Sequence, residues 1–283
     1  MQMDFTPDAP LVLVGCGHMG HAVALGWLAA GLNPEAFYIV DPVVHEDAVT
    51  GVPASQFVRN ADELPAGLVA RAVVLAVKPQ IMNAILPTIV PFIGAESMVI
   101  SVAAGVTIQQ MQRGTEAEAV YVRAMPNTTA AVGAGITGVT ALPAISSANK
   151  AMACALMEAT GQAVWIEQEA QMDAVTAVSG SGPAYVFYMV ESMTSAGVQA
   201  GLSRDVAAAL ARQTVIGAGQ LMASQAEVDA GELRKRVTSP GGTTAAALSV
   251  LMNEATRTGT DGLADLMTRA IDAACKRGAE LSG

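Results

Sequence analysis

Residues 11–20 read LVLVGCGHMG, an apolar run that ends in a glycine-rich loop, and the helix-like stretch HAVALGWLAAG begins at His21. The run predicts a buried strand, and Gly15, Gly17 and Gly20 form the GxGxxG pattern of strand–loop–helix units that bind dinucleotides. The first glycine permits a tight turn, the second lets backbone approach a pyrophosphate, and the third allows close packing of helix on strand. The free N–H groups at the start of the helix attract phosphate. We therefore expect a nucleotide site made by Gly15, Cys16, Gly17, His18, Met19 and Gly20, although a glycine-rich turn of an unrelated α/β domain has the same pattern.

Short apolar runs alternate with helix-like stretches in the first part of the chain. Because these runs are apolar throughout, they indicate parallel strands covered on both faces rather than one-sided strands. The runs are Leu11 to Gly15, Phe37 to Asp41, Ala72 to Val77, Met98 to Val102 and Ala119 to Arg123. Gly133 to Leu142 and Gln162 to Ile166 look like further strands around a helix at Ser146 to Thr160. The predicted fold class is α/β, with a doubly wound, Rossmann-like parallel sheet over residues 1–166.

The alternation ends near Glu167, and long Ala-rich stretches follow. They predict helices at Pro183 to Ala200, Arg204 to Gln225, Thr244 to Met252 and Leu263 to Leu281. Only 4% of all residues are aromatic whereas Ala, Gly and Met are abundant, which suits closely packed helices or a helical subunit interface. Residues 167–283 are therefore expected to form an all-helical C-terminal domain.

The net charge and the cysteine content limit the binding partners and the cellular compartment that the sequence predicts. A formal net charge of −10 argues against general binding to nucleic acid or to an anionic membrane surface. Cys16, Cys154 and Cys275 are widely spaced, with no CxxC pair, so neither a disulfide framework nor a zinc site is implied. With no export signal in MQMDFTPDAP and no long uninterrupted apolar stretch, the sequence predicts a cytoplasmic protein without a membrane span.

Asp41 ends the second predicted strand, about twenty residues beyond the glycines, where an acid can accept hydrogen bonds from an adenosine ribose and repel a 2′-phosphate. The following residues, PVVHEDAVT, contain no Arg or Lys that could bind that phosphate, and the next candidate is Arg59. Asp41 therefore favours NADH. The alternative is that Asp41 only caps a turn before Pro42.

The strand at Ala72 to Val77 ends in AVKPQ, and the next strand ends in SVAAG. In an open α/β sheet, ligands bind at the carboxyl ends of the strands, so these loops should flank the nicotinamide half of a dinucleotide. Lys78 belongs either to this site or to solvent.

Two further loops, SGSGPAY (Ser179 to Tyr185) and TSPGGTT (Thr238 to Thr244), each precede an Ala-rich helix. Exposed N–H groups at such a helix start can bind a carboxylate, and a neighbouring hydroxyl can donate to a nitrogen. The alternative is ordinary helix capping by Ser179 and Thr243.

Taken together, GCGHMG, AVKPQ, SVAAGVT, RAMPNT (Arg123 to Thr128), SGSGPAYVF and RVTSPGGTT resemble the pyrroline-5-carboxylate reductase family, in order along the whole chain. The resemblance implies reduction of 1-pyrroline-5-carboxylate to proline by NADPH or NADH. It also implies a helical C-terminal domain that forms a homodimer or a ring of dimers.

The family's cofactor contacts correspond to Gly15 to Gly20, Asn60, Ala76, Val77, Lys78 and Pro79, and Val102, Ala103 and Ala104. Its substrate contacts correspond to the loop residues Ser239, Gly241, Gly242, Thr243 and Thr244, and to Glu169 and Arg236. The chain departs from the family at His18, where Asn is common, and at Asp41, where many relatives have a small or polar residue followed by Arg. The second departure sets the family's NADPH against the NADH that Asp41 favours.

For the reaction, we expect hydride transfer from nicotinamide to C5 of the imine. N–H groups of Gly242, Thr243 and Thr244 would bind the carboxylate, and the Thr244 hydroxyl would hydrogen-bond the imine nitrogen as the catalytic contact. A β-hydroxyacid dehydrogenase is one alternative, but its catalytic helix lysine has no counterpart after Ser179 until Lys235. A nucleotide-binding regulator without catalysis is the other, since fold alone does not decide activity.

Overall fold

The computed structural model describes residues 5–43, 49–252 and 262–282, so part of PVVHEDAVT, the segment after Asp41 without Arg or Lys, lies outside the described residues. The chain divides into two compact units, Met1–Ser181 with Ala274–Gly283 and Gly182–Ala273. This division lies later than the expected boundary after residue 166, because the segment that follows still packs on the sheet. Its Glu169 pairs with Arg123 of a central strand, and Val175 lies against Gly138 of another.

The first unit contains one sheet in which the described residues form eight strands, ordered β3-β2-β1-β4-β5-β6-β7-β8. Their bounds are β1 Leu11–Val14, β2 Phe37–Val40, β3 Phe57–Val58, β4 Ala72–Leu75, β5 Met98–Ser101, β6 Val120–Met125, β7 Gly135–Ala141 and β8 Gly161–Trp165. From β3 to β6 all pairs are parallel, which confirms the parallel pairing predicted for β1, β2, β4, β5 and β6. The order of β3-β2-β1-β4-β5-β6 is that of a doubly wound dinucleotide-binding sheet.

The sheet departs from the prediction at two places. β7 runs antiparallel to β6, with Val122 opposite Ala141, while β8 is parallel to β7. Residues 126–134 are too few for the crossover that a parallel connection needs, so the chain turns back directly. The two-residue strand β3 was not predicted, because two residues carry no periodicity.

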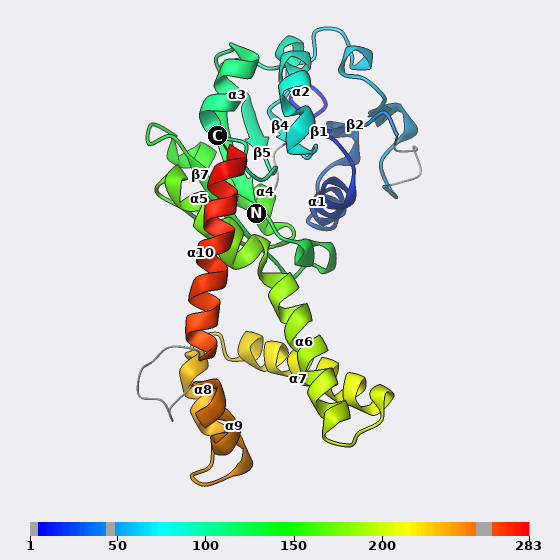
Figure 1. Ribbon diagram of the computed structural model, residues 1–283. Coiled ribbons are helices and arrows are strands. Elements are labelled where there is room, and N and C mark those ends of the chain that lie inside the picture. The colour runs from blue at the N-terminus through cyan, green and yellow to red at the C-terminus, as the bar shows by residue number, and fades with distance from the viewer. Residues whose placement is uncertain (1–4, 44–48, 253–261, 283) are drawn as a thin grey trace. The chain divides into compact units, whose positions relative to one another are not determined.

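Helices cover both faces of the sheet (Figure 1). α1 (His18–Ala29) and α4 (Ser147–Glu158) pack on one face, and α2 (Met82–Ile89) and α3 (Ile108–Thr115) on the other. Alternate residues of β1 enter the two cores, Leu11 and Leu13 on the side of Trp27, and Val12 and Val14 on the side of Leu86. Burial on both faces explains why each strand is apolar throughout.

The second unit is helical in its described residues, as predicted. It contains α6 (Gly182–Gln199), α7 (Arg204–Ser224), α8 (Ala230–Arg236), α9 (Thr243–Leu251) and the first part of α10 (Leu263–Ser282), and the short α5 (Met172–Val175) precedes it in the first unit. α8 was not predicted. Many large apolar side chains are exposed here, including Phe187 at 62% and Val250 at 76%. Helices with this much exposed apolar surface are suited to burial against another chain.

None of the helices in the described residues combines the length and the apolar character that crossing a bilayer requires.

Candidate active site

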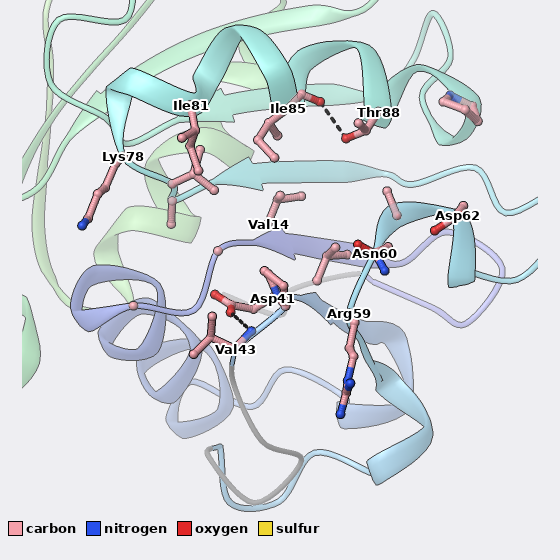
Figure 2. Close-up of a pocket in the computed structure, with 18 residues that line it drawn as sticks. Val14, Asp41, Val43, Arg59, Asn60, Asp62, Lys78, Ile81, Ile85 and Thr88 are labelled. Carbon is pink, nitrogen blue, oxygen red and sulfur yellow. Dashed lines mark hydrogen bonds between the residues drawn. The ribbon is translucent and has the colours of Figure 1, made fainter.

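A cleft of about 1130 Å³ lies at the carboxyl ends of β1, β2 and β4 and beside the segment that follows β3 (Figure 2). This is the edge where open α/β sheets bind ligands. Seven of the sequence-predicted cofactor residues line it: Gly15, Gly17, Asp41, Asn60, Ala76, Val77 and Lys78. Side chains that sequence reasoning did not single out complete the wall, among them Asp62, Ile81, Ile85 and Thr88.

The glycine loop has the geometry that a pyrophosphate requires. Gly15 has φ +90°, and a Cβ there would lie 2.9 Å from the Ala76 carbonyl oxygen. A Cβ on Gly20 would lie within 3.0 Å of the Gly15 carbonyl carbon, so the helix can approach the strand only with glycine here. A Cβ on Gly17 would meet nothing within 4 Å. The backbone at Gly17 therefore faces open space, and no side chain caps α1 above it, which fits a bound dinucleotide phosphate.

Asp41 holds the end of β2 against the glycine loop. Its Oδ2 accepts a hydrogen bond from the Cys16 N–H at 2.7 Å, and its Oδ1 accepts one from the Val43 N–H at 2.8 Å. The hydrogen bond from Val43 is the turn cap that the sequence offered as the alternative role of Asp41. Asp41 nevertheless also lines the cleft. Capping and ligand binding are thus compatible, because each carboxylate oxygen has more than one acceptor site.

Arg59 and Asn60 reach the same cleft from the segment after β3. Glu63 holds this segment: its carboxylate accepts from the Arg59 N–H at 3.0 Å and from Asn60 Nδ2 at 3.0 Å. The Arg59 backbone bond, then the Asn60 side-chain bond, lowers the pKa of the Glu63 carboxyl. The structure therefore places Arg59, which is distant in sequence, at the wall of the cleft that Asp41 lines.

Cys16 and His18 line a different hollow, of about 700 Å³, between α1 and residues 130–133. Burial, with the nearby charge of Asp41 as the smaller cause, raises the pKa of the Cys16 thiol to about 11. The thiol is therefore protonated at neutral pH. Cys16 and His18 do not line the cleft; from this loop, Gly15 and Gly17 do.

The other predicted cofactor residues do not line the cleft; they are Met19, Gly20, Pro79, Val102, Ala103 and Ala104. Val102 and Ala103 follow β5 directly and are almost fully buried. The Ala103 N–H donates to Ser101 Oγ at 3.2 Å, and the Val102 N–H to the Leu75 carbonyl at 3.1 Å. These residues lie at the carboxyl edge of the sheet, next to the end of β4.

The predicted substrate loop lies in the second unit, between α8 and α9. Ser239 to Gly242 form a turn in which the Gly242 N–H donates to the Ser239 carbonyl at 3.0 Å. Gly241 occupies the position with φ +71°, after Pro240, the pattern of a type II turn. The Gly242 N–H is therefore used inside the turn in this structure, and its binding of a carboxylate stays a prediction. Thr243 and Thr244 begin α9, which no side chain caps.

Neither Ser179 nor Thr243, the caps considered from the sequence, caps the helix that follows its loop. Ser179 lies inside a helical segment, where its Oγ donates to the Val175 carbonyl at 2.8 Å, and Gly242 rather than Thr243 is the N-cap of α9. Arg236 is the last residue of α8, near the substrate loop in sequence. Its guanidinium hydrogen-bonds Gln225 Oε1 at 3.1 Å and lies 3.9 Å from Glu232.

Glu169 has structural partners in the first unit. Its Oε1 accepts from the Ile108 N–H at 2.8 Å, at the start of α3, and lies 3.6 Å from Arg123 Nη1. Arg123 is almost fully buried, and Asp173 Oδ1 lies 3.7 Å from Arg123 Nη2. The sequence did not indicate this ion-pair cluster, since its members are far apart along the chain.

Comparison with known proteins covers both units. Residues 169–281 match the family model described as pyrroline-5-carboxylate reductase dimerisation, and residues 10–105 match that described as NADP oxidoreductase, coenzyme F420-dependent. The pyrroline-5-carboxylate reductase of Pseudomonas aeruginosa is 39% identical over 96% of both chains, and that of Synechocystis sp. is 37% identical over 96% of this chain and 97% of its own.

Solved structures agree over the same length. A pyrroline-5-carboxylate reductase from Coxiella burnetii superposes with a TM-score of 0.84 at 33% identity, covering 98% of this chain and 99% of that one. Plasmodium falciparum pyrroline carboxylate reductase with NADP bound has a TM-score of 0.77 at 28% identity, covering 98% of this chain and all of the other. With the dinucleotide cleft and the Ser239–Thr244 turn both present, the chain belongs to the pyrroline-5-carboxylate reductase family.

Proposed function

We propose that this protein reduces 1-pyrroline-5-carboxylate to L-proline with a reduced nicotinamide dinucleotide, as the last step of proline synthesis. The observation that carries the proposal is the full-length similarity to pyrroline-5-carboxylate reductases, which spans both units. The cleft at the sheet edge supports it independently, because its glycine loop leaves room for a dinucleotide phosphate.

The cofactor would lie along the cleft, with its pyrophosphate at Gly15 to Gly20 and its adenosine ribose near Asp41 and Asn60. Ala76 to Pro79 and Val102 to Ala104 would border the nicotinamide. The nicotinamide supplies the hydride. The protein's part is to orient two anionic reactants, and orientation of this kind can lower a barrier by roughly 7–11 kcal/mol.

The substrate would bind at the start of α9. There, the N–H groups of Thr243 and Thr244 would bind the carboxylate, and the Thr244 hydroxyl would hydrogen-bond the ring nitrogen. No acidic residue lies in the first turn of α9, and three basic residues end α8, so the local charge favours an anion. The iminium carbon accepts the hydride while nitrogen keeps its proton and becomes the amine, so no lysine acid is required. Ser239 and Gly241 would shape the turn, and Arg236 would add positive charge.

For the cofactor, we propose a preference for NADH with NADPH still accepted. Asp41, held by two backbone N–H groups, places negative charge where a 2′-phosphate would bind. Arg59 lines the same cleft and can pair with that phosphate, which makes NADPH usable.

We also propose a homodimer, or a larger ring of dimers, formed through the second unit. Residues 169–281 match a dimerisation family, and α6, α7 and α9 expose large apolar side chains. Light scattering coupled to gel filtration would measure the subunit number. The cytoplasmic location and the lack of nucleic-acid binding stay predictions from the sequence.

Steady-state reduction of 1-pyrroline-5-carboxylate, with NADH and NADPH side by side, tests reaction and cofactor together. Turnover of 3-hydroxy acids instead would favour a dehydrogenase, although α6 and α7 contain no lysine. Dinucleotide binding without turnover of the imine would favour a regulator and contradict the proposal.

A further inference from the structure

Two motifs to which the proposed chemistry assigns no role, RAMPNT and SGSGPAY, contact each other in the structure. Arg123, Met125 and Asn127 alternate along β6 and its extension, so their side chains share one face. Each meets the segment that follows β8. Arg123 lies near Asp173, Met125 Cε lies 2.8 Å from the place a Cβ on Gly180 would take, and Asn127 Nδ2 donates to the Ser179 carbonyl at 3.1 Å.

The Ser179 carbonyl lacks the donor that an α-helix would give it. In an α-helix it would accept from the N–H four residues later, but that residue is Pro183, which has none. The chain here forms a π-helical turn, Thr176–Gly180, closed by the Ser181 N–H donating to the Thr176 carbonyl at 2.8 Å. Such turns are rare and are often found at functional sites. The amide of Asn127 supplies the donor that the proline lacks.

The Asn127 side chain has one possible orientation. Its Oδ1 accepts from the Ile136 N–H at 3.2 Å and from Thr129 Oγ1 at 2.7 Å, and the residue is 8% exposed. A backbone N–H can only donate, so the oxygen must face Ile136 and the NH₂ group must face Ser179. Asn127 therefore joins the end of β6, the start of β7 and the π-helical turn.

This junction lies beside the residues proposed to border the nicotinamide and at the end of the dinucleotide-binding unit. Ser101 pairs with Arg123, so Val102 to Ala104, proposed to border the nicotinamide, run on beside the end of β6. The π-helical turn leads along the chain into α6, the first helix of the unit that contains Thr244. A shift of the turn would change where the chain leaves the dinucleotide-binding unit.

We propose that Asn127 is a positioning residue for hydride transfer, which acts by holding the Ser179 carbonyl and with it the π-helical turn. The inference rests on the proposed imine reduction for its kinetic consequence. Asn127 touches neither reactant in this proposal. Loss of the Asn127 amide donor lowers the rate of hydride transfer. The cofactor still binds, because Asn127 does not line the dinucleotide cleft.

The first experiment compares Asn127→Asp with the matched control Thr129→Val in the full-length protein. The aspartate keeps the shape and the acceptor for Ile136 but removes the donor to Ser179, whereas the valine removes another hydrogen bond of the same cluster. We expect Asn127→Asp to lower kcat for the imine by roughly tenfold or more. The NADH Kd, measured by fluorescence titration, should stay within about twofold of the parent. An unchanged kcat, or an equal loss in Thr129→Val, would overturn the proposal.

The second experiment places Asn127→Asp in a Pro183→Ala background. Alanine restores an N–H at position 183 that can donate to the Ser179 carbonyl, so the loss in kcat caused by Asn127→Asp should shrink to about twofold. General destabilisation would not be corrected by this change. The same loss in both backgrounds would contradict the assigned partner.

Hydrogen exchange of the peptide spanning residues 176–186, measured without imine, separates this inference from the proposed function. Faster exchange in Asn127→Asp, but not in Thr129→Val, is expected if Asn127 holds the turn; equal exchange would refute that role. A parent protein that reduces no imine would overturn the proposed function and the kinetic part of the inference, and exchange would still decide whether Asn127 holds the turn.

Discussion

The Asp41 carboxylate accepts a hydrogen bond from the backbone N–H of Cys16 at 2.7 Å, and so connects the end of β2 to the glycine loop. The carboxylate is therefore held in position before any cofactor binds. Its charge is placed where the ribose of a dinucleotide is expected.

Asp41→Asn should reduce the preference for NADH. We expect the ratio of kcat/KM with NADH to kcat/KM with NADPH to fall by roughly tenfold, since the repulsion of a 2′-phosphate is removed. The control Glu96→Gln removes the same charge from an exposed position that does not line the cleft. Arg59→Ala should shift the ratio in the opposite direction. If neither Asp41→Asn nor Arg59→Ala changes the ratio, Asp41 and Arg59 do not determine the choice between NADH and NADPH.

Gly17→Ala should weaken NADH binding without destabilising the fold, and Gly20→Ala should destabilise the fold. A Cβ at Gly17 meets nothing, so the variant should keep its Tm and lose NADH affinity, because the methyl group occupies the phosphate's approach. A Cβ at Gly20 would collide with the Gly15 backbone, so that variant should lose about 1–3 kcal/mol of unfolding free energy. Thermal melts and fluorescence titration measure the two effects, and a Gly17→Ala protein with normal NADH affinity would contradict the assigned phosphate site.

Glu169→Gln should mainly affect stability. Its carboxylate pairs with the buried Arg123 and accepts from the Ile108 N–H, and we expect a loss of about 1–3 kcal/mol in chemical denaturation. Glu167→Gln is the matched control, because that side chain is 80% exposed and should change stability by less than about 0.5 kcal/mol. A raised KM for the imine at unchanged stability would instead support the substrate role suggested by the family resemblance.

Thr244→Ala should lower kcat/KM for the imine far more than it changes cofactor affinity. The alanine keeps the backbone N–H and removes only the hydroxyl, so the effect isolates the contact with the ring nitrogen. We expect a loss of roughly a hundredfold, as for other hydrogen bonds that act in a transition state. Thr243→Ala, which also keeps its N–H, should lose much less. Equal kinetics in both variants would exclude the Thr244 hydroxyl from the chemistry.

Alkylation should report the raised pKa of Cys16. The thiolate is the reactive form, and burial keeps the pKa near 11, so the thiol stays protonated below that pH and reacts slowly with iodoacetamide. The rate, followed by peptide mass spectrometry at several pH values, should rise until the pH passes about 11. Asp41→Asn should shift the rise to lower pH, because it removes the smaller of the two causes. A plateau near pH 9 would show that the thiol is solvated.

Local patterns in the sequence were enough for the parallel strands β1, β2, β4, β5 and β6, the glycine loop and the helical second unit. Strands buried on both faces must be apolar throughout, and a tight strand–helix turn needs glycine at Gly15 and Gly20, so these features follow from residues close together in the chain. The resemblance across the whole chain identified the family for the same reason: each of its motifs is local.

Contacts between distant residues were decided only by the tertiary structure. Sequence spacing could not show that Arg59 lines the cleft of Asp41, that Glu169 is held by Arg123, or that Asn127 supplies the donor missing at Pro183. It also could not show that the Gly242 N–H donates within its own turn. Propensity and periodicity describe neighbours along the chain, whereas a hydrogen-bond partner is chosen by packing, which brings together groups that the sequence separates.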